Sequence, residues 1–453
     1  MNKIFLYGPP ASGKSTLGKA LAGALKAEFV DLDAEIVKHE GKEIKDIFAE
    51  KGEAYFRDVE SECLKLVTTS PQQKVVVALG GGTLLRDENR QVAEENGTVI
   101  CLDAPSEEVL KERIAAGGDV RPLGNKAKER SAHYASFEHR IARYFLLDGS
   151  TVVVGNGIAP ALITNEKVVV DENISRLHSS FVARNSSLFT MPSGEEYKTP
   201  ASIIEMWSAF AKAGLGRKDR VVAVGGGVTG DMTGFAAATW MRGIDWINVP
   251  TTLLSMVDAS TGGKTGCDLP EGKNLAGAFH SPKLVIVDED FLKTLPASVL
   301  KCGKAEMIKH RAIGNCADTI ADNLAVKVGI VREDPFETKG KRILLNCGHT
   351  IGHAVEKDSN YTLSHGEAVA IGCVEEAKLA VRLGMTTNAW VNEFAAEFEK
   401  AGLPTSYNKD IKSLVPIMMS DKKKSGGTSV TFTLPCGWGD VRAVKIDLSK
   451  GLP

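Results

Sequence analysis

The stretch "KIFLYGPPASGKST", residues 3–16, constrains the fold more than any other part of the chain. A short apolar run leads into "GPPASGKST", which matches the pattern GxxxxGK[ST], and residues 14–27 have the pattern of a helix. The backbone N–H groups of such a loop and the N-terminus of the next helix hold phosphate groups, which requires a strand before the loop and a helix after it. The sequence therefore predicts an N-terminal α/β domain with a phosphate site.

If the phosphate belongs to ATP, roles can be predicted for the polar side chains of this loop. Lys14 is expected to reach the β- and γ-phosphates, and the Ser15 hydroxyl to bind Mg²⁺. The predicted ATP contacts in the loop are Gly8, Ala11, Ser12, Gly13, Lys14, Ser15 and Thr16.

Hydrophobic patterning divides the chain into three regions. Strand-like runs alternate with helical ones over residues 1–148, as in a doubly wound parallel sheet, and the alternation restarts at "DGSTVVVGNGI" for a second lobe over 149–295. Helical patterns follow at 296–311, 317–331, 340–358, 366–384 and 389–402, and no strand is expected in 296–453. The predicted fold class is therefore α/β: a P-loop sheet, a Rossmann-like α/β lobe, and a mostly helical metal-binding lobe.

Composition narrows the class of protein further. The chain has 453 residues, of which 43% are apolar and 25% charged, and its formal net charge is −2. This charge gives no field that attracts nucleic acid, and no apolar run approaches the roughly 20 residues that span a bilayer. The eight cysteines form no CxxC pair, and the N-terminus lacks a signal-peptide pattern. We expect a cytoplasmic protein that acts on small molecules.

Three short motifs lie where strands of the first region are expected to end. They are "DLD" at 31–33, "FRDVE" at 56–60 and "GGG" at 80–82. Ligands of open α/β sheets bind at the carboxyl ends of strands, where an acidic pair can hold Mg²⁺ and orient a hydroxyl, and an arginine can clamp a carboxylate. Taken singly, the aspartates could instead cap a helix and the arginine form a surface ion pair.

Together with the phosphate loop, "GEAYFRDVE", "ALGGGT" and "RPLG", these motifs make residues 1–148 resemble the shikimate kinase family. The resemblance implies that Asp33 orients the 3-hydroxyl of shikimate, that Asp31 joins Ser15 at Mg²⁺, and that Arg121 covers ATP as a lid. The implied shikimate contacts are Asp33, Arg57, Gly80, Gly81, Gly82 and Arg140. The family continues with a further strand and helix where this chain starts its second region, so the kinase fold must be completed differently.

A second glycine-rich turn, "VVAVGGGVTGD", is the first candidate binding motif in the other two regions. It lacks GxGxxG, yet the backbone from Gly226 to Asp231 can receive a pyrophosphate at a helix start. Lys264 and Lys273 follow in another glycine-rich segment and suggest a phosphate-bearing ligand, although exposed lysines are usually only solvated.

Three histidines lie close together in "GHTIGHAVEKDSNYTLSHGE", residues 348–367. His349 and His353 share a helical face, but "HTIGH" lacks the glutamate of HExxH, which argues against a metalloprotease. Glu306 in "AEMIKH" supplies a carboxylate upstream. From spacing alone, any two of the histidines together with a carboxylate could bind a catalytic metal ion.

These segments, with "PSGEEYKT", "PTTLLSMVDASTGGKTG" and "GKNLAGAF", resemble the 3-dehydroquinate synthase family over roughly 150–445. The resemblance implies Zn²⁺ (or Co²⁺) held by Glu306, His349 and His365, with His353 facing the substrate. It implies a homodimer through the synthase half. It also implies NAD contacts from Ser193, Gly194, Glu195, Glu196, Tyr197, Lys198, Gly227, Val228, Thr229, Gly230, Asp231, Thr251, Thr252, Lys264, Lys273, Phe291, Leu292, Lys293 and Thr294.

The resemblances also imply substrate-binding and catalytic residues. The synthase substrate site would contain Arg242, Asn274, Lys327, Arg342, Asn346 and Lys422. The residues expected to act in catalysis are Asp33, Lys14, Lys264, Lys309, His353 and Asp258. The interval between Lys309 and Lys327 is shorter than the family's, which predicts a trimmed helical lobe that keeps its site.

The two resemblances together predict a bifunctional shikimate-pathway enzyme of aromatic amino acid biosynthesis. One half would convert 3-deoxy-D-arabino-heptulosonate 7-phosphate to 3-dehydroquinate and phosphate with NAD, and the other would phosphorylate shikimate with ATP and Mg²⁺. Two alternatives stay open. One is another P-loop kinase fused to a glycerol-dehydrogenase-like enzyme, and the other is a synthase with a degenerate regulatory kinase domain.

Overall fold

One sheet of eleven strands runs through the first two predicted regions. The computed structural model describes residues 2–69, 74–104, 130–419 and 427–453. The strand order is β2-β3-β1-β4-β5-β6-β13-β10-β9-β7-β8. Its strands are β1 (Asn2–Tyr7), β2 (Glu28–Asp31), β3 (Lys74–Ala78), β4 (Gly97–Leu102), β5 (His139–Leu147), β6 (Ser150–Asn156), β7 (Lys167–Asp171), β8 (Ser186–Met191), β9 (Arg220–Gly225), β10 (Asp245–Pro250) and β13 (Leu284–Asp288).

The sheet reverses direction once, at the hairpin between β5 and β6. β5 pairs in parallel with β4, with His139 beside Ile100, and antiparallel with β6, with Leu147 beside Ser150. Gly149 makes the turn at φ +69°, a conformation that glycine adopts without strain. The predicted boundary at 148 lies in this turn, but the sheet does not break there. β5 completes the N-terminal sheet and also begins the next one.

The reversal puts the carboxyl ends of the two sets of strands on opposite edges of the sheet. β1 to β4 run parallel to β5, whereas β7 to β10 and β13 run parallel to β6. Because ligands bind at the carboxyl ends of such strands, the two halves must bind their ligands on opposite edges.

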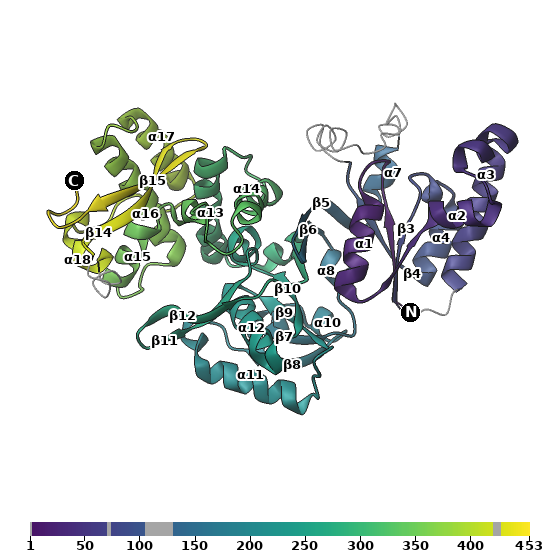
Figure 1. Cartoon of the computed structure of the whole chain (residues 1–453), viewed down its shortest axis with the longest axis horizontal. Coiled ribbons are helices and arrows are strands. Elements are labelled where there is room, and N and C mark those ends of the chain that lie inside the picture. The colour runs from purple at the N-terminus through teal and green to yellow at the C-terminus, as the bar shows by residue number, and fades with distance from the viewer. Residues whose placement is uncertain (1, 70–73, 105–129, 420–426) are drawn as a thin grey trace.

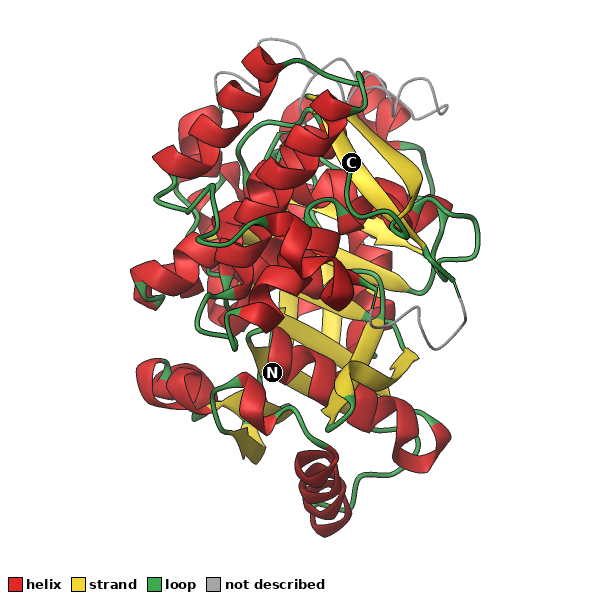
Figure 2. Ribbon diagram, turned by 90° about the vertical axis from the view of Figure 1, so that its left-hand side faces the viewer, coloured by secondary structure: helices red, strands yellow, loops and turns green. Residues whose placement is uncertain are grey.

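Helices cover both faces of this sheet, as Figure 2 shows. Gly13 is the N-cap of helix α1, with a φ of +92° that suits glycine, and the helix buries Leu17, Leu21 and Leu25 at helical spacing. Among the described residues, the α-helices of these two regions are α1 (Lys14–Leu25), α2 (Leu32–Glu40), α3 (Ile44–Thr69), α4 (Asp87–Asn96), α7 (Ser131–Ala135), α8 (Ile158–Leu162), α9 (Glu172–Leu177), α10 (Ser179–Val182), α11 (Pro200–Lys212) and α12 (Gly227–Thr239).

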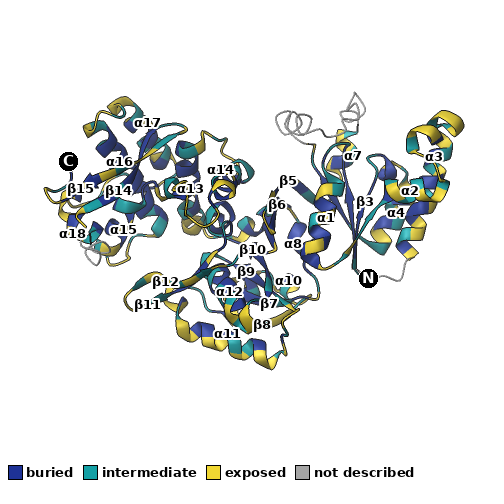
Figure 3. Cartoon of the chain, in the orientation of Figure 1, coloured by how far each residue is buried: buried dark blue, intermediate teal, exposed yellow. Residues whose placement is uncertain are grey.

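A single hydrophobic core joins the halves. It contains Leu21 of α1, Val153 of β6 and Val224 of β9, and the central strands are buried along their length in Figure 3. Glu166 lies at the same junction, where it pairs with Arg220 and, at 2.9 Å, with the Lys74 ammonium. The N-terminal and middle regions therefore share their interior.

The C-terminal region is mostly helical and lies at the far end of the molecule from the N-terminal region (Figure 1). Its helices are α13 (Ala297–Gly314), α14 (Ile320–Glu333), α15 (His349–Asp358), α16 (His365–Arg382), α17 (Asn388–Lys400) and α18 (Val415–Met418). Only residues 315–319 join α13 to α14, which is the shortened interval noted in the sequence. No helix in the described part of the chain is long and apolar enough to cross a membrane.

The expectation of no strand after 295 was wrong. β14 (Ser429–Gly437) and β15 (Asp440–Asp447) form an antiparallel hairpin that turns at Trp438 and Gly439, where Gly439 has φ +77°. Phe432 and Leu434 of β14 are fully buried in the C-terminal core, so tertiary packing stabilises the hairpin. A second hairpin, β11 (Lys264–Leu269) with β12 (Gly272–Phe279), projects from the middle region.

Candidate functional sites

The phosphate loop connects β1 to α1 as the sequence predicts. Gly8 and Gly13 have φ values of +136° and +92°, which a side chain would strain. The Lys14 ammonium donates to the carbonyls of Gly8 and Pro9, at 2.9 Å each. Lys14 thus lies over the loop that is predicted to bind phosphate.

The predicted magnesium pair also comes together. The Ser15 hydroxyl donates to Asp31 Oδ2 at 2.6 Å, while Asp31 Oδ1 accepts from the Asp33 backbone N–H at 3.1 Å. Asp31 therefore caps α2, as the plainer interpretation proposed, and also contacts Ser15.

The three glycines bring this loop to Asp33 and Arg57. A Cβ on Gly80 would lie 3.4 Å from Asp33 Oδ1, and a Cβ on Gly82 only 2.7 Å from the Arg57 guanidinium. A Cβ on Gly81 would lie 3.0 Å from Pro10 in the phosphate loop. Glycine is needed here for close approach, and the approach joins residues from four separate segments.

A buried carboxylate holds Arg57 in place. Glu60 is 1% exposed, pairs with Arg57 Nη1 at 2.6 Å and accepts from the Thr83 hydroxyl at 2.7 Å. Burial opposes the charge of Arg57, but Glu60 outweighs it, and the pKa of Arg57 is raised.

Arg130 approaches this site although the sequence analysis did not single it out. It hydrogen-bonds the Tyr134 side chain, whose hydroxyl donates to the Gly81 carbonyl at 2.8 Å. Arg140 instead lies on β5 with Nη2 2.5 Å from Asp103 Oδ1. No sequence motif shows which of the two arginines approaches the site, since both lie near the end of the first region. Arg121 lies outside the described residues, as does Lys422.

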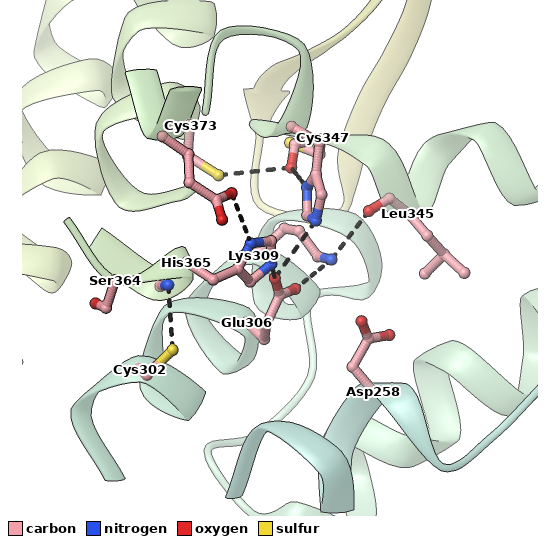
Figure 4. A network of polar contacts seen from close by, with 12 residues as sticks. Asp258, Cys302, Glu306, Lys309, Leu345, Cys347, Ser364, His365 and Cys373 are labelled. Atoms are coloured by element: carbon pink, nitrogen blue, oxygen red, sulfur yellow. Dashed lines mark hydrogen bonds and ion pairs between the residues drawn. The ribbon is translucent and has the colours of Figure 1, made fainter. Parts of the chain in front are cut away.

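On the opposite edge of the sheet, Glu306, His349 and His365 converge in the C-terminal region. Their ligand atoms lie within 4.8 Å of one another. The Nε2 atoms of His349 and His365 are each 3.6 Å from Glu306 Oε1, and Figure 4 shows His365 directed at this carboxylate. Two ligands that each lie about 2.1 Å from a tetrahedral Zn²⁺ are roughly 3.4 Å apart, so this arrangement fits such an ion.

The Nδ1 atom of each of these two histidines also has a partner. His349 Nδ1 lies 3.0 Å from the Cys347 carbonyl, and His365 Nδ1 lies 3.4 Å from Glu356 Oε2. A carbonyl or carboxylate at Nδ1 directs Nε2 toward a metal ion. Glu376 adds support because its carboxylate accepts from the Gly348 N–H at 2.7 Å, which ties the start of α15 to α16.

Electrostatics in this cluster favour a cation. Burial lowers the pKa of His349 to about 3, so its imidazole is neutral and able to bind a metal. Burial opposes a charge on His365 too, but Glu306 and Glu356 together raise its pKa to about 9. A proton on His365 therefore compensates the same carboxylates that a metal ion would.

His353 lies beside the cluster but is exposed, with its ring 5.2 Å from that of His349. It forms a second set with Glu356 and His365, whose ligand atoms also lie within 4.8 Å of one another. The Lys273 ammonium forms an ion pair with Glu356 at 2.8 Å. The structure thus places His353 at the open side of the Glu306 cluster.

Two buried lysines belong to the same group of charges as Glu306. Lys309 is fully buried, pairs with Glu306 and donates to the Leu345 carbonyl at 2.9 Å. Lys327 of α14 pairs with Asp258, which lies in a short π-helical turn at Ser255–Ala259. The chain therefore keeps Lys327 at the site despite the shortened interval before it.

Of the remaining predicted substrate residues, Arg342 lies near Lys327 and Asp258. The Arg342 guanidinium donates to the carbonyls of Gly262 and Pro335, at 3.0 and 2.7 Å, and Lys264 pairs with Glu337 at 2.6 Å. Asn346 ends the short helix Arg342–Asn346 and is exposed. Arg242 lies apart, in an exposed turn with φ +69°.

Most of the predicted NAD segments follow the carboxyl ends of β8, β9, β10 and β13. Lys198 donates to Asp231 and to Asn274, at 2.7 Å each, which links two of these segments to a predicted substrate residue. A small cavity lined by Gly226, Gly230 and Asp231 lies at the start of α12. Phe291 is buried beside His178, which contacts the Thr294 hydroxyl at 2.8 Å.

Asp171, at the end of β7, was not among the site residues predicted from the sequence, although it contacts one of them. It accepts from the Ser193 hydroxyl at 2.9 Å, and Asn173 donates to the same hydroxyl at 2.6 Å. The signal was available, since "KVVVDEN" has an aspartate where a parallel strand ends.

Comparison with known proteins identifies the family. A profile described as 3-dehydroquinate synthase N-terminal matches residues 188–302, and its C-terminal counterpart matches 283–424. A 3-dehydroquinate synthase from Acaryochloris marina is 41% identical over 75% of this chain and 91% of its own length. One from a Synechococcus species is 44% identical over 56% of this chain and 75% of its own length. The chain belongs to the 3-dehydroquinate synthase family.

A further part is fused to this synthase. A profile described as Shikimate kinase matches residues 10–171, so the match runs past the β5–β6 turn. The chain is a bifunctional enzyme of the shikimate pathway, with 3-dehydroquinate synthase and shikimate kinase regions.

The fold of the synthase part is shared with a related cyclase of known structure. A 2-epi-5-epi-valiolone synthase from Streptomyces hygroscopicus, solved with NAD⁺ and Zn²⁺ bound, is 25% identical with a TM-score of 0.59. The match covers 65% of this chain and 92% of that one.

A cavity of about 390 Å³ lies where the synthase and kinase parts meet. The kinase part contributes Thr98 and Glu138 to its wall, and the synthase part contributes Pro160, Phe181 and Phe291.

Proposed function

We propose that Glu306, His349 and His365 hold the Zn²⁺ or Co²⁺ of the synthase reaction. The observation that carries this assignment is the convergence of one buried carboxylate and two imidazoles whose Nδ1 atoms are already held. The related cyclase was solved with NAD⁺ and Zn²⁺ bound, which supports a metal ion in the synthase part of this chain. When bound, the metal polarises substrate hydroxyl oxygens as a Lewis acid, and NAD accepts and returns a hydride.

The residues around this centre bind and orient the substrate. Lys264 and Arg342 supply positive charge for the phosphate of 3-deoxy-D-arabino-heptulosonate 7-phosphate. His353, on the open side of the cluster, faces the reacting carbons and moves a proton during phosphate elimination. Lys309 and the Asp258–Lys327 pair add charged groups beside this centre.

NAD lies along the carboxyl edge of the synthase strands. Its pyrophosphate is received at the start of α12, where Gly226 and Gly227 leave the backbone open. Lys198 and Asp231 hold each other beside that turn, and Thr251 and Thr252 follow from the next strand.

In the kinase part, Lys14 neutralises the transferred phosphate, and Ser15 with Asp31 holds Mg²⁺. Asp33 orients the shikimate 3-hydroxyl toward ATP. We propose Arg130 as the second carboxylate-binding arginine beside Arg57, in place of Arg140, since Arg130 reaches the Gly80–Gly82 loop through Tyr134. Catalysis here rests on positioning and charge compensation.

We also propose a homodimer formed by the synthase part. On β12, Leu275 and Phe279 share one face and are 57% and 45% exposed, and Phe336 packs edge-to-face on Phe279 while 61% exposed. An apolar surface of this kind suits a second copy of the chain. All eight cysteines are free, which supports a cytoplasmic location.

A paired assay tests the two activities. The purified chain is expected to release phosphate from 3-deoxy-D-arabino-heptulosonate 7-phosphate when NAD and Zn²⁺ are present. It is expected to consume ATP only when shikimate is added. Absence of phosphate release contradicts the synthase assignment, and ATP consumption that ignores shikimate contradicts the kinase assignment.

A further inference from the structure

His310 has no role in the assignments above, yet its position is unusual. It lies on α13 next to Lys309, its side chain is 0% exposed, and neither ring nitrogen has a hydrogen-bond partner among the described residues. Its Nε2 atom is 3.8 Å from Asp258 Oδ1, which is just beyond hydrogen-bonding distance.

An unpartnered buried imidazole is disfavoured, because it loses its hydrogen bonds to water and gains none. Burial lowers the pKa of His310 to about 4, so the ring is neutral and one of its nitrogens carries a hydrogen. The charged groups that face it are Lys309, Asp258, Glu306 and Lys327. Asp258 is the nearest acceptor among them.

Asp258 currently has a different partner. The Lys327 ammonium contacts both the carboxylate and the backbone carbonyl of Asp258. In the proposed function, Lys327 belongs to the site of an anionic substrate. An ammonium that turns to that substrate leaves the Asp258 carboxylate, which is only 22% exposed, without its donor, and this is unfavourable.

We propose that His310 is a positioning residue that takes over Asp258. When Lys327 turns to the anionic substrate, His310 donates a hydrogen bond from Nε2 to Asp258 Oδ1 and holds the carboxylate in place. The unpartnered imidazole thus supplies a donor to Asp258 when Lys327 leaves it. The part that concerns substrate rests on the proposed function, whereas the exchange of partners at Asp258 does not.

The exchange can be tested without turnover, by thermal unfolding of the full chain. His310→Phe removes a buried polar group, so alone it is expected to leave the unfolding midpoint unchanged or raise it. Combined with Lys327→Met, the same substitution removes the remaining donor to Asp258 and is expected to lower the midpoint by about 2 °C or more. An identical effect in both backgrounds overturns the proposal.

The substrate arm uses kinetics in the presence of NAD and Zn²⁺. We expect His310→Phe to reduce kcat/KM for the heptulosonate phosphate about tenfold or more, with bound zinc unchanged. His310→Gln retains a donor and is expected to stay within about threefold of the wild type. Ile308→Val, on the same helix, serves as the matched packing control. Equal losses in the phenylalanine and glutamine variants, or loss of zinc, contradict the proposal. An inactive wild type refutes the proposed function and leaves the unfolding test decisive.

Discussion

The kinase and synthase sites are assembled by different means. The kinase site is built around contiguous motifs, and its lysine is held by backbone carbonyls of the loop that precedes it. The synthase site is built from side chains that are distant in sequence, and its charges are already paired in a dry interior, where Glu306 and Lys309 are fully buried. Backbone geometry therefore prepares the first site for a ligand, whereas mutual charge compensation prepares the second.

The shared sheet gives the strongest test of how independent the two parts are. We expect residues 1–148, expressed alone, to be insoluble or unfolded, because the cut removes β6 and exposes the core face of α1. A domain is stable by only about 5–15 kcal/mol, so loss of this shared packing is expected to unfold the fragment. Circular dichroism and sedimentation of the fragment measure the outcome.

A nicked full-length chain is the matched control for that fragment. A protease site inserted at Asp148–Gly149 cuts the turn but leaves every strand in place. We expect the two pieces to remain together and to keep both activities. A fragment 1–148 that is folded and phosphorylates shikimate would show that the two parts are independent after all.

The next largest effect comes from removing the central charge of each site in turn. Lys14→Ala is expected to reduce ATP turnover about 10³-fold or more while phosphate release by the synthase stays unchanged. Glu306→Gln is expected to do the reverse and to lose bound zinc, because the amide does not replace the carboxylate charge. Both assays and a zinc measurement are run on each variant. Any loss in the untouched activity would reveal coupling between opposite edges of the sheet.

The same contrast explains what could be predicted from the sequence. The phosphate loop, "DLD" and the glycine triplet are local patterns whose geometry follows from backbone rules, and the structure brings them together at one edge. The pairing of Lys327 with Asp258 and the support of α15 by Glu376 depend on tertiary packing and leave no periodic signal. The β14–β15 hairpin was missed for the same reason, because Phe432 and Leu434 are strand residues only once the helical core covers them.

The choice among the three histidines was left open by spacing alone and is resolved by comparing two substitutions. His353→Asn is expected to reduce kcat about 10²-fold while zinc remains bound, because the ring lies on the open side of the cluster. His349→Asn is expected to lose zinc, since it removes a converging Nε2. Metal content per chain decides the comparison. Zinc loss in the His353 variant would favour the second set with Glu356 and His365.

The smallest expected effect concerns Glu166 at the junction of the two parts. Burial favours its neutral form, but Arg220 and Lys74 outweigh burial and lower its pKa. A carboxylate with a lowered folded-state pKa stabilises the fold above its unfolded value of about 4.3, and this stability is lost as the pH falls below that value. Glu166→Gln is therefore expected to be less stable than wild type by about 1–3 kcal/mol at pH 7. In urea unfolding, the difference should shrink at pH 3.5, and a gap that stays constant with pH would mean that the pair contributes through packing and not through charge.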